Sequence, residues 1–158
     1  LTSYAPLFAH VDGWQWTPDL IWFDNLSSYG TPNYYVQKMF ANNKGTRLLS
    51  TLSQGQTLSG QNELYASSVI DEGSKEIIVK IVNAGSTEKL VNIQLEGVKR
   101  IGKSGTRIQL ISDDLNGVNS LDHPLRIAPS EEQFTMKGKN ISMKLAASSF
   151  SVFKIPLQ

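Results

Sequence analysis

The sequence predicts a mainly β protein, in which an antiparallel, jelly-roll-like β-sandwich over residues 46–158 follows a strand–loop–helix segment over residues 1–45. Three observations support this prediction. Hydrophobic and polar residues alternate in short runs after residue 46, and turns that contain glycine separate these runs. The first segment differs in composition, because it holds all three tryptophans and ten of the 14 aromatic residues.

The chain opens with a predicted strand, an aromatic loop and a second short strand. Ser3–Ala9 is an apolar stretch that suits a buried strand, with Pro6 confining it to a strand end or bulge. The loop that follows holds Trp14 and Trp16. Leu20–Phe23 then forms an apolar core that predicts a second short strand or an extended buried piece.

A helix is predicted over Pro32–Asn42. Thr31 offers a hydroxyl for the N-cap, and the fixed φ of Pro32 suits the first helical turn. Apolar side chains recur with helical spacing and define one face: Tyr35, Val36, Met39 and Phe40. Gly45 is expected to end the helix in the left-handed conformation.

The alternation after residue 46 predicts about eight strands. Val91, Ile93 and Leu95 alternate with polar residues, which is typical of a strand with one buried face. The predicted strands are Leu48–Leu52, Tyr65–Asp71, Ile77–Asn83, Leu90–Leu95, Arg107–Ser112, Leu125–Ile127, Ile141–Leu145 and Phe150–Ile155. Short strands at this spacing, with no helical pattern between them, favour an antiparallel sandwich. Asp113–Pro124 is predicted to be a long surface loop.

The bulk composition excludes several classes of function. A net charge of +1 with dispersed lysines and arginines gives little support for nucleic-acid binding. The absence of cysteine excludes disulfides and thiolate metal sites, and no apolar run approaches the roughly 20 residues of a membrane span. No histidine cluster or phosphate-binding glycine loop is present, so we expect neither a metal nor a cofactor.

Three stretches of the first segment carry a family resemblance. Tyr4–Phe8, Trp16–Asp24 (W-T-P-D-L-I-W-F-D) and Tyr29–Gln37 (Y-G-T-P-N-Y-Y-V-Q) strongly resemble the α-L-arabinofuranosidases of glycoside hydrolase family 51, in the plant and Bacteroidetes-type branch. The match is close over residues 4 to about 40. The β-rich remainder fits the C-terminal sandwich of that family in length and position, without a sharp motif of its own.

The resemblance implies that residues 1–45 are the end of a TIM-barrel catalytic domain, with its last strand, loop and helix, and that residues 46–158 are a C-terminal sandwich. Family 51 enzymes resemble other retaining glycosidases in using two glutamates, whose carboxyl groups must lie about 5–5.5 Å apart. The first glutamate of this chain is Glu63, inside the β-rich part. We therefore expect the parent to remove terminal α-L-arabinofuranosyl residues, and this chain to be structural and inactive by itself.

The same resemblance, together with sugar chemistry, suggests substrate-binding residues. Aromatic rings pack on the apolar face of a sugar, while carboxylates accept hydrogen bonds from its hydroxyls. Asp19, Trp16 and Trp14 are the predicted substrate-binding residues, and no catalytic residue is expected. For Trp14 a surface loop is an equal alternative, and Trp22 is predicted to pack inside the barrel. His10 is expected to be satisfied by local hydrogen bonds.

Two further hypotheses remain open from the sequence. The sandwich is alternatively a carbohydrate-binding module, although residues 46–158 hold no tryptophan. The partner is expected to be an arabinofuranosyl-containing oligo- or polysaccharide bound through the parent's barrel, with no nucleic acid and no membrane span, and the compartment to be secreted or periplasmic. Because residues 1–45 carry much apolar surface, we expect this segment to fold back on the sandwich, to lose order, or to self-associate.

Overall fold

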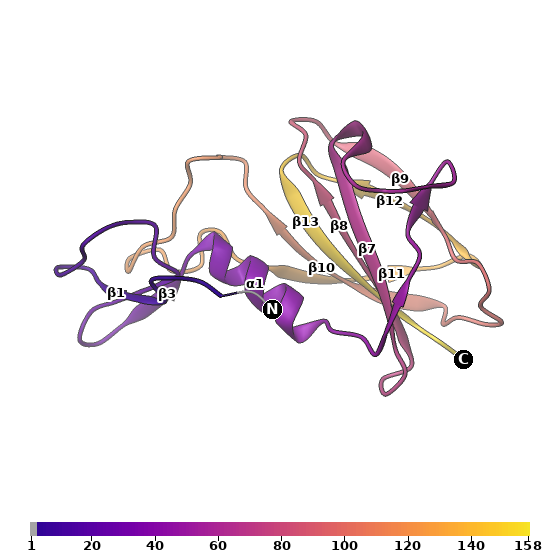
Figure 1. The fold of residues 1–158 in the computed structure, drawn as a ribbon, viewed down its shortest axis with the longest axis horizontal. Helices are drawn as coiled ribbons and strands as arrows, with labels where there is room; N and C mark the ends of the chain where they lie inside the picture. The colour runs from indigo at the N-terminus through magenta and orange to yellow at the C-terminus, as the bar shows by residue number, and fades with distance from the viewer. Residues whose placement is uncertain (1–2) are drawn as a thin grey trace.

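The computed structural model describes residues 3–158, which form a β-sandwich with one helix and a small three-stranded sheet at one end (Figure 1). In chain order the elements are β1 (Phe8–His10), β2 (Ile21–Phe23), β3 (Ser28–Gly30), α1 (Pro32–Asn42), β4 (Arg47–Leu49), β5 (Leu52–Ser53), β6 (Gln56–Thr57), a 3₁₀ turn (Gln61–Glu63), β7 (Leu64–Asp71), β8 (Glu76–Asn83), β9 (Lys89–Gln94), β10 (Ser104–Ile111), β11 (Ser130–Thr135), β12 (Asn140–Leu145) and β13 (Ser149–Pro156).

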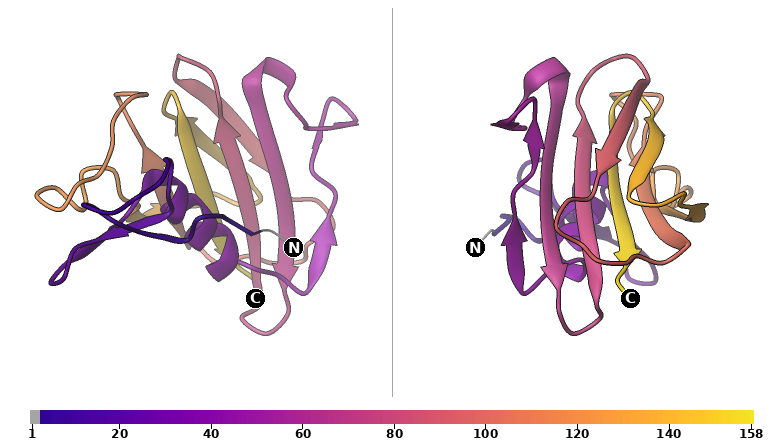
Figure 2. Two further views of the ribbon diagram at one scale, coloured as in Figure 1. Left: turned by 60° about the vertical axis from the view of Figure 1, so that its left-hand side comes forward. Right: turned by 90° about the vertical axis from the view of Figure 1, so that its right-hand side faces the viewer.

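The large sheet has six strands in the order β11-β10-β13-β8-β7-β4, and each neighbouring pair is antiparallel. A second, two-stranded sheet pairs β9 with β12 and lies across one face of the large sheet (Figure 2). These two sheets make the predicted antiparallel sandwich.

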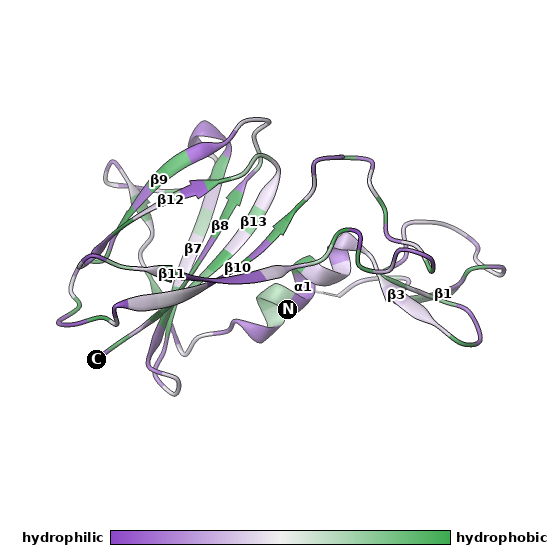
Figure 3. Ribbon diagram, turned by 180° about the vertical axis from the view of Figure 1, so that it is seen from behind, coloured by the Kyte–Doolittle hydropathy of each residue, from purple (hydrophilic) through white to green (hydrophobic). Residues whose placement is uncertain are grey.

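The central strands β8 and β13 are buried on both faces, whereas the alternation of Ile77, Val79 and Ile81 in β8 predicted one buried and one wet face for that strand. The reason is that the large sheet is covered on both sides. On one side a core cluster packs against β9 and β12; it includes Val79, Ile81, Leu95, Ile141, Leu145 and Phe153. On the other side a second cluster packs against α1; it includes Tyr35, Met39, Ile78, Leu110, Phe150 and Val152. In Figure 3 hydrophobic patches accordingly mark β8, β9 and β13.

Helix α1 has the predicted bounds. Its N-cap Thr31 accepts a hydrogen bond from the amide of Tyr34, and Pro32 occupies the first turn. The residue predicted to cap its C-terminus, Gly45, was wrong. Asn43 is the C-cap and donates to the carbonyl of Met39, while Gly45 does not adopt a left-handed conformation. A Cβ at Gly45 would lie 2.6 Å from the side chain of Val69, so a glycine is required there by close packing against β7.

Most predicted strands are confirmed within a few residues, with two exceptions. The predicted strand Leu48–Leu52 is divided between β4 and β5. Leu125–Ile127 is not a strand, because the backbone of Ile127 bonds instead to the side chain of Asn119. The edge strand β11 (Ser130–Thr135) was not predicted, because its sequence is mostly polar and shows no hydrophobic alternation.

The small N-terminal sheet has the order β1-β2-β3, with β1 parallel to β2 and β2 antiparallel to β3. The regular strand begins at Phe8, later than predicted, because Pro6 has no N–H for a ladder. Strand β3 was not predicted. Two carbonyl groups before β1 still accept hydrogen bonds from the start of β2, in the pairs Leu20 N–Pro6 O and Ile21 N–Leu7 O.

The loop between β10 and β11 contains the predicted loop Asp113–Pro124 and reaches from the sandwich to the small sheet (Figure 1). Its base is braced by an ion pair of 3.1 Å between Arg126 Nη2 and Asp114 Oδ2. Within residues 3–158, no helix is both long and apolar enough to cross a lipid bilayer.

Candidate functional site

The loop between β1 and β2 ends in a buried carboxylate. Asp19 is only 1% exposed, and neither of its side-chain oxygens has a hydrogen-bond partner. These two oxygens are the only buried side-chain nitrogen or oxygen atoms without a partner in the part of the chain that the structure describes. The predicted substrate residue is therefore the one exceptional polar group of the fold.

The backbone beside Asp19 is held firmly in place. The carbonyl of Leu20 accepts two hydrogen bonds from Thr31, one from its amide at 3.1 Å and one from its hydroxyl at 3.0 Å. The amide of Leu20 donates to the carbonyl of Pro6 at 3.3 Å. The start of α1 thus fixes the residue that follows Asp19, so the carboxylate sits on a rigid support.

An unpartnered buried carboxylate is a costly arrangement. Leaving a buried polar group without a partner costs about 1–3 kcal/mol, and a charged group costs more. Buried polar groups in native proteins are almost always satisfied, so each exception requires an explanation. Asp19 is such an exception among the described residues.

The three tryptophans have different surroundings. Trp16 is 62% exposed and Trp14 is 51% exposed, so both rings are open to solvent. Trp14 also contacts Trp22 edge to face, with ring centroids 5.9 Å apart. Trp22 lies in β2 and is half-buried. Trp14 and Trp16 thus present open aromatic surface, and Trp22 packs against the ring of Trp14.

His10 and Asp24 have structural roles beside this loop. The Nδ1 atom of His10 accepts a hydrogen bond from the amide of Asp12, and its ring packs edge to face on Phe23, which confirms the local role predicted for it. Asp24 closes the turn between β2 and β3. The amide of Leu26 and then that of Ser27 donate to this carboxylate and hold its pKa below the usual value.

A groove of about 350 Å³ lies where the small sheet, the first turn of α1 and the β10–β11 loop meet. Its lining includes Tyr29, Tyr34, Tyr35, Lys38 and Leu125. Burial raises the pKa of the Tyr29 hydroxyl, and burial followed by the neighbouring Tyr34 raises that of Tyr35. The groove could not be predicted from the sequence, because its walls come from segments that are distant in the chain.

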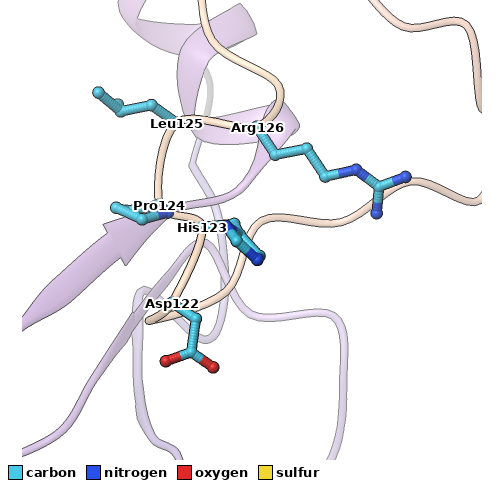
Figure 4. A pocket seen from close by; sticks show the side chains of 5 residues that line it. All are labelled: Asp122, His123, Pro124, Leu125 and Arg126. Atoms are coloured by element: carbon cyan, nitrogen blue, oxygen red, sulfur yellow. The ribbon is translucent and has the colours of Figure 1, made fainter.

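A second, more open depression is formed by the tip of the β10–β11 loop (Figure 4). The side chains of Leu125 and Arg126 point to opposite sides, and Asp122 points away from both. No group of polar atoms converges there, so the depression does not have the arrangement of a binding site. His123, which the sequence analysis placed in a loop, lies in it.

Two pairs of adjacent acidic residues, Asp113–Asp114 and Glu131–Glu132, lie in the second half of the chain. Asp114 is bonded to Arg126 in the loop, as described above. Glu132 lies in β11, where it pairs with the buried Arg107 at 3.3 Å. Among residues 3–158 no group of three or more histidine, aspartate or glutamate side chains is close enough to hold a metal ion.

The sandwich offers few aromatic rings to a sugar. Phe134, Phe150 and Phe153 are buried in the two core clusters, and Tyr65 is exposed. Phe150 and Phe153 therefore pack inside the sandwich and are not available to a sugar.

The family is decided by comparison with known proteins. The profile of the α-L-arabinofuranosidase C-terminal domain matches residues 1–149. The chain belongs to this family. The matched region covers both the Asp19 loop and most of the sandwich.

One relative of this family matches nearly the whole chain, and another matches about a third of it. Alpha-L-arabinofuranosidase 1 of Arabidopsis thaliana is 31% identical over 161 residues, which cover 98% of this chain and 23% of the Arabidopsis protein. An extracellular exo-α-L-arabinofuranosidase of Streptomyces chartreusis is 55% identical over 49 residues, or 31% of this chain and 6% of that protein.

The fold also agrees with a solved structure. An arabinose-bound family 51 α-L-arabinofuranosidase matches with a TM-score of 0.87 and 31% identity, covering 99% of this chain and 24% of that one. The mainly β sandwich predicted from the sequence is therefore confirmed. The present chain spans about a quarter of the length of these long-matching relatives.

Proposed function

We propose that this chain is the C-terminal part of a retaining α-L-arabinofuranosidase, in which Asp19 binds hydroxyl groups of the arabinofuranosyl substrate. The observation that carries the proposal is the buried Asp19 carboxylate with two unpartnered oxygens. Sugar hydroxyls are donors that suit such a carboxylate. The named activity of the Arabidopsis relative, which matches over 98% of this chain, supports the same substrate class.

The exposed tryptophans complete this side of the site. Trp14 and Trp16 lie in the loop that ends at Asp19, and both present open aromatic surface. An aromatic ring packs on the apolar face of a sugar, while the carboxylate fixes the direction of its hydroxyls. We assign them to the walls of the substrate site.

The division into domains follows from the same proposal. Residues 1–45 are the last strand, loop and helix of a TIM barrel, and residues 46–158 are the C-terminal sandwich. Two features support this. The β1–β2 pair is parallel, an arrangement that usually needs cover on both faces. Leu7 and Phe8 are exposed on this pair, at the place where neighbouring barrel strands would pack.

The catalytic glutamates are assigned to the part of the enzyme that precedes this chain. The 158-residue chain should then release no nitrophenol from 4-nitrophenyl α-L-arabinofuranoside, while the whole enzyme releases it rapidly. Hydrolysis by the purified chain at a rate comparable with that of the enzyme would contradict the proposal.

A carbohydrate-binding sandwich is the second candidate, and the exposed Tyr65 is the one aromatic residue of residues 46–158 that favours it. A sugar platform normally needs several exposed rings, so we place the binding in the Asp19 loop instead. Calorimetric titration of the chain with arabinan or arabinoxylan fragments separates the two. Submillimolar affinity that persists in Asp19→Asn but is lost in Tyr65→Ala would support the alternative.

Two further features belong to this proposal. The exposed Leu7, Phe8 and Trp16 favour self-association of the chain when the barrel is absent, and sedimentation at two concentrations tests this. Secretion or export to the periplasm is also proposed, because the Streptomyces relative is named as extracellular. Detection of the parent enzyme only inside intact cells would contradict it.

A further inference from the structure

Residues 3–45, which include Asp19, contact the sandwich through many apolar side chains but through few hydrogen bonds. Helix α1 packs on the large sheet through apolar side chains such as Tyr35 and Met39. Apolar packing is strong but has little directionality. Among residues 3–158, a single hydrogen bond crosses from residues 3–45 to residues 46–158, and it links Asn119 to Gly30.

The side chain of Asn119 is buried and makes three hydrogen bonds. It is 2% exposed and lies in the β10–β11 loop. Its amide nitrogen donates to the carbonyl of Gly30 at 2.8 Å and to that of Ile127 at 2.9 Å, and its oxygen accepts from the amide of Ile127 at 2.8 Å. The two bonds to Ile127 fix the orientation of the amide group, so the third is aimed at Gly30.

The link leads to Asp19 in two steps. Gly30 is the last residue of β3 and pairs with Ile21, two residues after Asp19. The next residue, Thr31, donates twice to the carbonyl of Leu20. A shift of Gly30 would therefore move Thr31 and Leu20 together, and with them the Asp19 backbone.

We infer that Asn119 is a positioning residue, through which the sandwich sets the direction of the Asp19 carboxylate toward the substrate. The inference rests on the proposed function of Asp19. It gives the C-terminal sandwich a part in substrate binding although the sandwich itself does not touch the sugar.

The first test is amide hydrogen exchange of the 158-residue chain. Asn119→Ala should speed exchange of the β2 and β3 amides and of Thr31 by about tenfold, because it removes the one hydrogen bond that joins residues 3–45 to residues 46–158. Exchange in β8 and β13 should not change. Arg126→Ala is the matched control, since Arg126 braces the same loop through its ion pair with Asp114. Unchanged exchange in β3, or equal acceleration across the sandwich, would overturn the inference.

The second test is a double-mutant cycle in the whole enzyme with 4-nitrophenyl α-L-arabinofuranoside. Asn119→Ala should lower kcat/KM by about tenfold when Asp19 is present and by less than about twofold in the Asp19→Asn background. A loss by the same factor in both backgrounds would mean a general structural role and would overturn the inference.

Asn119→Asp gives a second variant for both tests. A carboxylate can still accept from the amide of Ile127 but cannot donate to Gly30, so it should reproduce the effects of Asn119→Ala. Asp19→Asn alone separates the two proposals. An unchanged kcat/KM in that variant overturns the role of Asp19, whereas a loss that Asn119→Ala does not share overturns only the role of Asn119.

Discussion

Replacing Asp19 by asparagine should stabilise the 158-residue chain while weakening the enzyme. The carboxylate is buried without a partner, and an unsatisfied buried polar group costs about 1–3 kcal/mol, with a charged group costing more. An amide of the same shape remains unsatisfied but carries no charge. We therefore expect the free energy of unfolding to rise by about 1–2 kcal/mol.

Urea unfolding followed by tryptophan fluorescence is the suitable assay, because all three tryptophans lie within residues 14–22 and report on this unit. For a slope of about 2 kcal/mol per molar, the midpoint should rise by about 0.5–1 M. Asp12→Asn is the matched control, since Asp12 lies in the same loop and is exposed. A lower midpoint in Asp19→Asn, or an equal rise in Asp12→Asn, would refute the reasoning.

Three other changes test the support of the site. Phe153→Ala should lower the stability of the sandwich by about 3–5 kcal/mol, because Phe153 is fully buried, and far-UV circular dichroism would show it. Thr31→Ala should cost about 1 kcal/mol by removing the N-cap of α1, measured by fluorescence. Because the folded-state pKa of Asp24 lies below its ordinary value of 3.8, its contribution is present above that pH and is lost as the pH falls through the lower value. The urea midpoint followed by tryptophan fluorescence should therefore fall as the pH is lowered below 3.8, and by less in Asp24→Asn.

The parts of the fold that local sequence determines were predicted well. Helix α1 was found because Thr31 and Pro32 define its start and apolar spacing defines its face. Strand β11 was missed because it lies at a sheet edge, where only Phe134 is buried. The two-sided burial of β8 was also missed, because it depends on α1 covering a sheet made from residues much later in the chain.

The candidate site was predicted only in part. The residue types of the Trp14–Asp19 loop, with a family resemblance, pointed to a sugar. The burial of Asp19 could not be predicted, because aspartate is usually exposed. The role of Asn119 had no signal in the sequence, since its partner Gly30 lies 89 residues away and asparagine is common in loops.

The most direct test is the kcat/KM of the whole enzyme carrying Asp19→Asn, with Asp12→Asn as control and 4-nitrophenyl α-L-arabinofuranoside as substrate. Loss of a charged hydrogen-bond acceptor for the sugar should lower kcat/KM by about 10- to 100-fold, while the control stays unchanged. Wild-type kcat/KM in a folded Asp19→Asn enzyme would contradict the assignment of this buried carboxylate to the substrate.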